Sequence, residues 1–402
     1  MVKISKFGEE FLLLELRIDK HIEGYVDFYI GPENLRRLVE NEPIASPNKL
    51  LNNCKNLQKN LSLQGYDKDR ERYLEKHLLA MRTSIEDLLK IEIPFKEKFL
   101  RLYDIELQPI NESELDKLVE DFNIAYKGSG SLGERMKVIR ERRKVPENKV
   151  YQFFKKSLAI VKMKTKELFG DILPNEEKIL IELVEDTDNN EAKWAYYEWY
   201  MGNYRSRIEV NPKFNIYWST LLTAAAHEGY PGHHANFVLN ELYLYQELRQ
   251  FEHSILLLNS PKLVICEGIA DIAVDVLFTY LEQAEISLEF CQDSTQEVKL
   301  DDLAMENKIK SKQSLFWFNL AYHALISKWN EKELVKYATN FKIISQKTIH
   351  NMLKMIFNPS HSTTAFLYNL GSNLIKKKYG EIPSVQNFQS LLENPFLPSD
   401  LL

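Results

Sequence analysis

Three of the nine histidines in the chain fall within eight positions, in the segment His227-Glu228-Gly229-Tyr230-Pro231-Gly232-His233-His234. Imidazole nitrogen is a good ligand for zinc and related divalent ions. A glutamate beside such a ligand can take a proton from a metal-bound water without binding the ion itself. This segment therefore predicts a metal centre, with Glu228 as the candidate general base.

The spacing of these histidines requires a distortion of the helix that carries them. The His-Glu opening matches that of zinc peptidases, but Pro231 stands where their motif has its second histidine. On a regular helix with ~3.6 residues per turn, His233 would lie about 240° around the axis from His227, and His234 about 10.5 Å along it. Neither could share an ion with His227, and Pro231 with Gly232 supplies the cause of a bulge or kink. We favour His233 as the second ligand, and the spacing leaves His234 as the alternative.

A third ligand is expected from a later helix, and the apolar segment around Glu267 is the candidate. A carboxylate among such neighbours is costly unless it is paired or metal-bound. The small residues Gly268 and Ala270 would let this helix pack closely on the histidine helix. Asp271, one turn after Glu267, could accept a hydrogen bond from a ligand imidazole.

Arg205 and Arg207 alternate along a predicted strand, so their side chains should point to the same face. A guanidinium beside the cleft could grip a substrate carboxylate with two hydrogen bonds. That contact would favour an exopeptidase that recognises a free C-terminus. A surface ion pair with a nearby acid is the evenly weighted alternative.

Two further histidines stand near segments of interest. His253 precedes an apolar run, and we interpret it as a partly buried histidine that supports the ligands rather than as a ligand. His361 could donate a hydrogen bond to the oxyanion that develops during metal-assisted hydrolysis. For His361 a loop that caps the next helix is the favoured alternative, because Ser, Asn and Pro surround it.

The histidine segment, 227–234, resembles the signature of a microbial domain-of-unknown-function family that is grouped with the zincin peptidases. The similarity covers residues 128–273 and is looser around Tyr368 and Gly371, while the N-terminal helices are similar only in general character. The similar stretches are Gly130-Ser131-Leu132-Gly133-Glu134-Arg135, Arg205-Ser206-Arg207-Ile208-Glu209-Val210-Asn211, Glu252-His253-Ser254-Ile255-Leu256-Leu257-Leu258-Asn259 and Glu267-Gly268-Ile269-Ala270.

This resemblance implies a mostly helical, zincin-like metallopeptidase architecture. It implies a metal ion at His227, His233 and Glu267. It also implies Glu228 as the catalytic base and Tyr368 as the donor to the oxyanion, but no particular substrate. Lipoprotein members of the wider group carry signal sequences, and we read none in this sequence.

Helical periodicity dominates the chain on both sides of a short β region. Apolar residues recur three and four positions apart over 9–127, 148–169 and 213–402. Branched and aromatic residues predict three strands of one small antiparallel sheet, over 179–184, 194–200 and 204–210. Residues 201–203 are typical of a hairpin turn. The predicted fold class is therefore mainly α with a small antiparallel β-sheet.

We expect residues 1–127 to form a helical cover and residues 128–402 the catalytic region, the two making one continuous structural unit. The segment from Lys127 to Ser131 has the most flexible composition in the chain. It would serve as a linker or a substrate loop, although a simple connection between helices is favoured on residue type.

The composition excludes several classes of protein. With 44% hydrophobic and 27% charged residues, the chain is typical of a globular protein rather than a disordered or fibrous one. Lys+Arg 52 against Asp+Glu 58, with both signs interspersed, predicts no nucleic-acid partner. Three dispersed cysteines indicate a reducing compartment. Without a signal peptide or a long apolar stretch, we expect a cytoplasmic protein with no membrane partner.

The leading hypothesis is a zinc-dependent hydrolase that cleaves short peptides, in which Glu228 serves as general base for metal-activated water. The same ligands would tolerate manganese, cobalt or iron. One alternative is a non-catalytic scaffold with a structural ion, and another is a hydrolase of a non-peptide amide or ester. The sequence does not separate a peptide from another small amide substrate, and it does not indicate an oligomeric state.

Overall fold

The computed structural model of the chain describes residues 4–184, 194–291, 299–343, 346–358 and 362–402. It is mainly helical with two small sheets, which confirms the predicted fold class at this level. Among the described residues, no helix combines the length and the apolar character needed to cross a membrane.

The first 127 residues are mostly helical, as predicted. Their helices are α1 (Lys6–Asp19), α2 (Glu33–Asn41), α3 (Pro47–Asn60), α4 (Lys68–Leu88), α5 (Phe95–Tyr103) and α6 (Glu112–Ala125), with a 3-10 turn at Leu61–Gln64. Strand β1 (Val26–Tyr29) was not predicted, and it pairs antiparallel with β5 (Ile255–Leu257). Phe251 and Ile255 also join the apolar core of these helices, so the N-terminal region packs directly on the rest of the chain.

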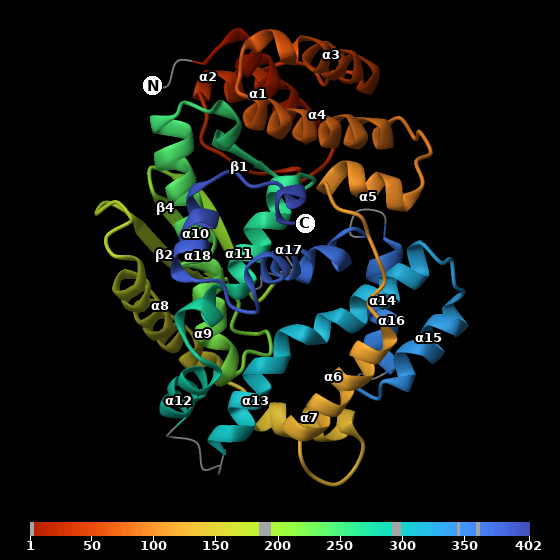
Figure 1. Cartoon of the computed structure of the whole chain (residues 1–402), viewed down its shortest axis with the longest axis vertical. Coiled ribbons are helices and arrows are strands. Elements are labelled where there is room, and N and C mark those ends of the chain that lie inside the picture. Colours follow the sequence, from red (N-terminus) through yellow and green to blue (C-terminus); the bar gives the residue numbers. More distant parts are fainter. Residues whose placement is uncertain (1–3, 185–193, 292–298, 344–345, 359–361) are drawn as a thin grey trace.

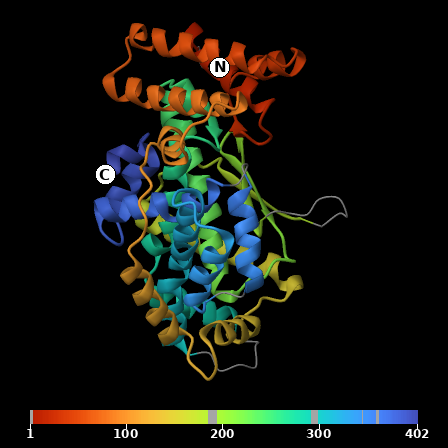
Figure 2. The ribbon, with the colours of Figure 1, turned by 90° about the vertical axis from the view of Figure 1, so that its right-hand side faces the viewer.

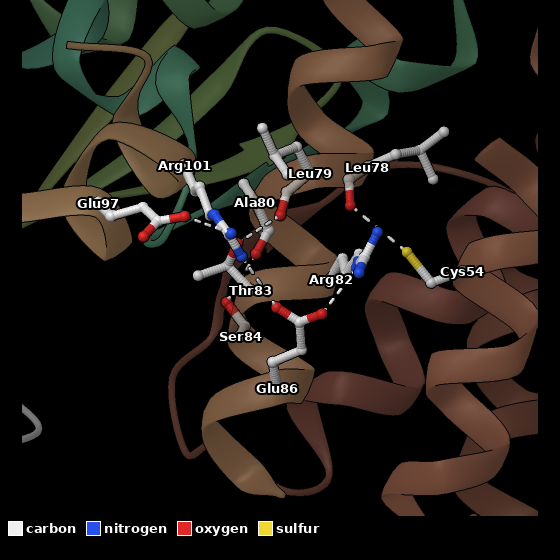
Figure 3. A network of polar contacts seen from close by, with 10 residues as sticks. All are labelled: Cys54, Leu78, Leu79, Ala80, Arg82, Thr83, Ser84, Glu86, Glu97 and Arg101. Atoms are coloured by element: carbon white, nitrogen blue, oxygen red, sulfur yellow. Dashed lines mark hydrogen bonds and ion pairs between the residues drawn. The ribbon is translucent and has the colours of Figure 1, made fainter. Parts of the chain in front are cut away.

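Polar contacts along α4 tie it to its neighbours, as Figure 3 shows. The carboxyl of Glu86 accepts hydrogen bonds from Arg82 at 2.7 Å and from Arg101 of α5 at 3.3 Å. On the other side, the thiol of Cys54 in α3 donates to the carbonyl of Leu78 at 3.4 Å. These contacts hold α3, α4 and α5 as one layer at the end of the molecule that carries the N-terminus (Figures 1 and 2).

Helices α7 (Leu132–Arg142) and α8 (Glu147–Phe169) follow α6 in the chain and precede the sheet. The glycine-rich segment 127–131 joins α6 to α7, and the side chain of Ser131 caps α7 together with that of Glu134. Helix α8 ends as predicted at Gly170, whose φ of +74° suits glycine.

The three predicted strands form one sheet in the order β2-β4-β3, with β2 (Lys178–Leu183), β3 (Tyr196–Gly202) and β4 (Arg205–Val210). Strands β3 and β4 make the expected antiparallel hairpin, whose turn places Asn203 and Tyr204 at positive φ. The prediction of a wholly antiparallel sheet is wrong, because β2 runs parallel to β4. The end of β2 and the start of β3 both lie beside Val210. The chain therefore reverses direction between β2 and β3 across β4, which makes β2 parallel to β4.

The remainder is helical, as predicted. Its α-helices are α9 (Trp218–Glu228), α10 (His233–Leu239), α11 (Pro261–Leu277), α12 (Tyr280–Phe290), α13 (Leu300–Lys310), α14 (Ser314–Leu325), α15 (Glu331–Asn340), α16 (Gln346–Phe357), α17 (Thr364–Tyr379) and α18 (Val385–Glu393). Shorter turns of π or 3-10 helix lie at Asn240–Glu247, Phe251–Ser254, Ser311–Gln313 and Pro398–Leu401. Figure 1 shows α11 and α17 near the middle of the molecule, below the N-terminal helices.

Gly268 gives α11 a close backbone contact with α17, and not with the histidine helix that we expected. A Cβ added to Gly268 would lie 2.4 Å from the carbonyl carbon of Gly371 in α17. Helix α11 does pack on the histidine helix as predicted, but the role given to Gly268 is wrong, because its bare backbone faces α17. Ala270 contacts the histidine helix through its backbone, since its carbonyl accepts a hydrogen bond from the imidazole of His227.

Candidate metal centre

The histidine helix does not bulge or kink between the two histidines favoured as ligands, but ends and restarts. Helix α9 ends at Glu228, and α10 begins at His233. A Cβ on Gly232 would lie 2.0 Å from the carbonyl oxygen of His227, so the chain can turn back this tightly only with glycine there. The distortion inferred from the spacing is thus a complete break between two helices.

This break brings His227 and His233 together beside Glu267 of α11. Nε2 of His227 lies 3.7 Å from Oε2 of Glu267, and Nε2 of His233 lies 3.7 Å from Oε1. The ligand atoms of all three residues lie within 4.8 Å of one another. Two ligands at about 2.0–2.1 Å from a tetrahedral ion are roughly 3.3 Å apart, so small side-chain movements would close this group around one ion.

The two imidazoles of the cluster are in the protonation state that binds a divalent ion. Burial lowers the pKa of His227 to about 4 and that of His233 well below its usual value, so both imidazoles are neutral. Burial, and then the carboxyls of Asp271 and Glu228, raise the pKa of Glu267 well above its usual value. Neutral imidazoles and a carboxylate are the forms that bind such an ion, whose charge would offset the repulsion among the carboxyls.

The group is packed deeply but remains within reach of solvent. The side chain of His227 is 21% exposed and that of Glu267 is 19% exposed, while His233 retains 11%. Each of the three side chains is therefore partly in contact with solvent.

Glu228 directly follows His227, is the last residue of α9, and is buried. Its carboxyl accepts a hydrogen bond from the backbone N–H of Glu198 in β3. Burial raises the pKa of Glu228 to about 8, the Glu198 N–H opposes this, and the carboxyl of Asp27 adds to it. Strand β3 thus holds the carboxyl of Glu228 beside the cluster of His227, His233 and Glu267.

Asp271 lies where the sequence placed it, one turn beyond Glu267. Its Oδ1 is 3.5 Å from Nδ1 of His227. The carbonyl of Ala270 accepts a hydrogen bond from the same imidazole. The carboxyl of Asp271 and the carbonyl of Ala270, both on α11, therefore orient the imidazole of His227.

His234 points away from the cluster and holds the break in place. It is fully buried, with Nδ1 2.6 Å from the hydroxyl of Ser206 and Nε2 2.8 Å from the carboxyl of Glu177. The phenol of Tyr230 donates to the same carboxyl at 2.6 Å. Of the two alternatives left open by the spacing, only His233 is placed with His227.

The two candidate substrate arginines lie on the sheet face opposite Ser206. Arg207 pairs with Glu209 at 3.0 Å and lies 3.7 Å from Glu182, while Arg205 is exposed. This arrangement is the ion pair that we weighed as the alternative to carboxylate binding for Arg207.

His253 belongs to another cluster. It is buried, its ring lies 5.0 Å from that of Tyr73, and its charged neighbours are Lys262 and Arg70. Tyr368 is part of α17, but its side chain is outside the described part of the chain, and His361 lies outside the described residues altogether.

Sequence reasoning missed two carboxylates beside the centre, Asp27 and Glu198. Both act electrostatically on Glu228, and Asp27 also acts on Glu267. The only signal for Glu198 was an acid at an inward position of an aromatic strand. Asp27 gave no signal, since it comes from β1, about two hundred positions before the histidines.

Comparison with known proteins identifies a related fold. No protein-family model and no curated protein matches the sequence. The chain is similar to a crystal structure described as that of a "putative lipoprotein" from Colwellia psychrerythraea, with TM-score 0.55 and 14% identity, over 89% of this chain and 66% of that one. A "putative lipoprotein of unknown function" from Shewanella oneidensis matches at TM-score 0.46 and 12% identity, over 90% of this chain and 77% of that one. At such identity the first similarity shows a shared fold alone, and this chain spans less than two thirds of that protein.

Proposed function

We propose that this protein is a metal-dependent hydrolase that cleaves short peptides, with a zinc ion bound by His227, His233 and Glu267. The observation that carries the proposal is the convergence of these three donors in a place that solvent reaches, with Glu228 held next to them. We also propose a zincin-like architecture, in which a third ligand from a later helix and an adjacent strand complete the site.

The residues of the chain take distinct roles in this proposal. When bound, a zinc ion supplies Lewis-acid polarisation of the scissile carbonyl and makes water more acidic. Glu228 accepts the water proton on its carboxylate and passes it to the leaving amine. The N–H of Glu198 fixes the position of that carboxylate, and Asp271 orients His227. We propose Tyr368, near the C-terminal end of the chain, as the hydrogen-bond donor to the oxyanion.

A purely structural ion is disfavoured by the number of donors. Structural zinc is usually closed by four protein ligands, whereas a catalytic ion keeps a free position. Among the described residues, three side chains form the cluster. Cys266, the nearest sulfur in sequence, donates instead to the amide oxygen of Asn236 at 3.4 Å and is not part of the cluster.

The metal content of the purified protein tests the ligand set. Elemental mass spectrometry should find close to one zinc per chain in the wild type, and much less in His233→Ala and Glu267→Ala. His350→Ala, which changes an exposed histidine on α16, is the matched control and should retain zinc. A wild type that takes up no divalent ion after reconstitution would end the proposal.

Hydrolysis tests the role of Glu228. The zinc-loaded Glu228→Gln variant should keep its metal and lose at least about 100-fold in kcat on peptides that the wild type cleaves. Parallel assays with peptides, small amides and esters would establish the substrate class. Wild-type rates in a variant with normal metal content would contradict the general-base role.

We also propose that the protein works in the reducing cytoplasm. Cys54 and Cys266 are buried thiols outside any disulfide, and burial raises the pKa of both to about 12. Inert thiols of this kind need no oxidising compartment. Cell fractionation with an antibody against the native protein would test this location.

A further inference from the structure

Strand β1 of the N-terminal region reaches the candidate metal centre and supplies a carboxylate to it. The phenol of Tyr197 in β3 donates a hydrogen bond to Oδ1 of Asp27. The next residue of β3, Glu198, donates its N–H to the carboxyl of Glu228. Two consecutive residues of one strand therefore hold Asp27 and the proposed general base beside each other. Asp27 is half-buried and so remains accessible to a ligand.

Glu198 adds a second carboxyl to the same place. Its side chain is 5% exposed, and its Oε1 has no hydrogen-bond partner among the described residues. Its charged neighbours are Asp27 and Glu228, both acids. A buried carboxyl oxygen without a partner is costly, so this position favours the arrival of a hydrogen-bond donor.

Four carboxyls gather at the centre, those of Glu228, Glu267, Asp27 and Glu198. Within the described part of the chain, neither Asp27 nor Glu198 has a lysine or arginine as an electrostatic partner. This set of acceptor oxygens suits a cationic group and does not suit a carboxylate.

We propose that Asp27, with Glu198 beside it, binds the ammonium group of a peptide substrate next to the scissile bond, and that this group is the free N-terminus. This inference rests on the proposed function. It assigns the site to amino-terminal rather than carboxy-terminal recognition, in keeping with the pairing of Arg207 to acids of its own sheet. It also makes the N-terminal region a contributor to the site rather than only a cover.

Binding to a protein that cannot turn over separates recognition from catalysis. On zinc-loaded Glu228→Gln, calorimetry should find that a peptide with a free N-terminus binds roughly 10-fold or more tightly than its N-acetylated form. Adding Asp27→Asn, whose amide oxygen can still accept from Tyr197, should reduce this preference to about 2-fold. The affinity for the acetylated peptide should not change.

The control is Glu241→Gln in the same background. Glu241 lies in the helical turn Asn240–Glu247. Its carboxyl accepts hydrogen bonds from the phenol of Tyr200, on the same strand as Tyr197, and from the N–H of Asn203 in the hairpin turn. This variant should retain the full preference for the free N-terminus. Equal binding of the two peptides, or a preference that survives Asp27→Asn, would overturn the inference.

A second pair of peptides identifies the source of the ammonium. If an acetylated peptide with lysine beside the scissile bond binds more tightly than its norleucine analogue, and Asp27→Asn abolishes the difference, the assignment to the free N-terminus is overturned and the lysine side chain is the ammonium that Asp27 binds. If the wild type cleaves free and acetylated peptides with equal kcat/KM, this inference fails while the proposed function stands. If the zinc-loaded wild type cleaves no peptide, the proposed function fails instead.

Discussion

Gly268 of α11 and Gly371 of α17 lie backbone to backbone at the centre of the molecule. A Cβ on Gly371 would lie 1.9 Å from the carbonyl oxygen of Val264, and 2.7 Å from the Cα of Gly268. Helix α11 also carries Glu267, the residue next to Gly268. The contact between the two glycines therefore holds α11, and Glu267 with it, against α17.

Gly371→Ala should lower both stability and metal affinity. The added methyl group cannot be accommodated unless α11 and α17 separate, and overpacking of this kind costs roughly 1–3 kcal/mol. Because the shift moves Glu267, zinc should also bind more weakly. Denaturant unfolding and zinc titration would measure the two effects. Asn373→Ala, on the exposed face of α17, is the control and should change neither. Wild-type stability in Gly371→Ala would contradict the close packing.

The composition and local pattern of the sequence predicted most helices and the grouping of His227, His233 and Glu267. Such features follow from signals that lie close together in the chain. Examples are the periodic spacing of apolar residues and the proline and glycine between the two histidines. Pairing between distant segments was not accessible in this way. Nothing near Lys178 indicates that its strand would run parallel to β4.

The parts of the site that were missed come from distant segments. Asp27 lies on a four-residue strand among helices, and it reaches the centre only because β1 pairs with β5 and packs on β3. The choice between His233 and His234 was likewise decided by a partner far away in sequence, Glu177, which takes His234 out of the cluster. Long-range contacts of this kind carry no signal in one sequence without homologues.

Gly232→Ala should disrupt the break between α9 and α10. Its Cβ would lie 2.0 Å from the carbonyl oxygen of His227, a backbone atom that cannot move without moving the ligand. We expect loss of zinc binding together with a stability loss of roughly 1–3 kcal/mol. Thermal unfolding with and without zinc would measure the loss of binding, because zinc raises the Tm only of a protein that binds it. An unchanged zinc-dependent rise in Tm would show that glycine is not required there.

Glu177→Gln should make stability less dependent on pH in the acid range. Hydrogen bonds from His234, Lys162 and Tyr230 outweigh burial and lower the pKa of Glu177 to about 2. A carboxyl with a lowered pKa stabilises the fold above its unfolded pKa of about 4.5, and this contribution disappears as the pH falls toward 2. The stability difference between wild type and variant should therefore be largest above about pH 5 and shrink below it. Urea unfolding at several pH values measures this difference, and a gap that is constant with pH would contradict the role of the charged carboxylate.

Breaking the ion pair of Arg70 and Glu252, which links α4 to the segment before β5, should strongly lower the stability of the fold. Both oxygens of the Glu252 carboxylate accept from the guanidinium, at 2.6 and 2.8 Å, and the Glu252 side chain is 1% exposed. Arg70→Met leaves that carboxylate buried without its partner, so the loss of stability should be about 3–5 kcal/mol. Glu252→Gln added to Arg70→Met removes the uncompensated charge and should restore part of the loss. Arg37→Met, which breaks an exposed pair with Glu33, is the control and should cost less than about 0.5 kcal/mol. If Arg70→Met were as stable as this control, the pair would not hold the N-terminal layer to the site-bearing part of the chain.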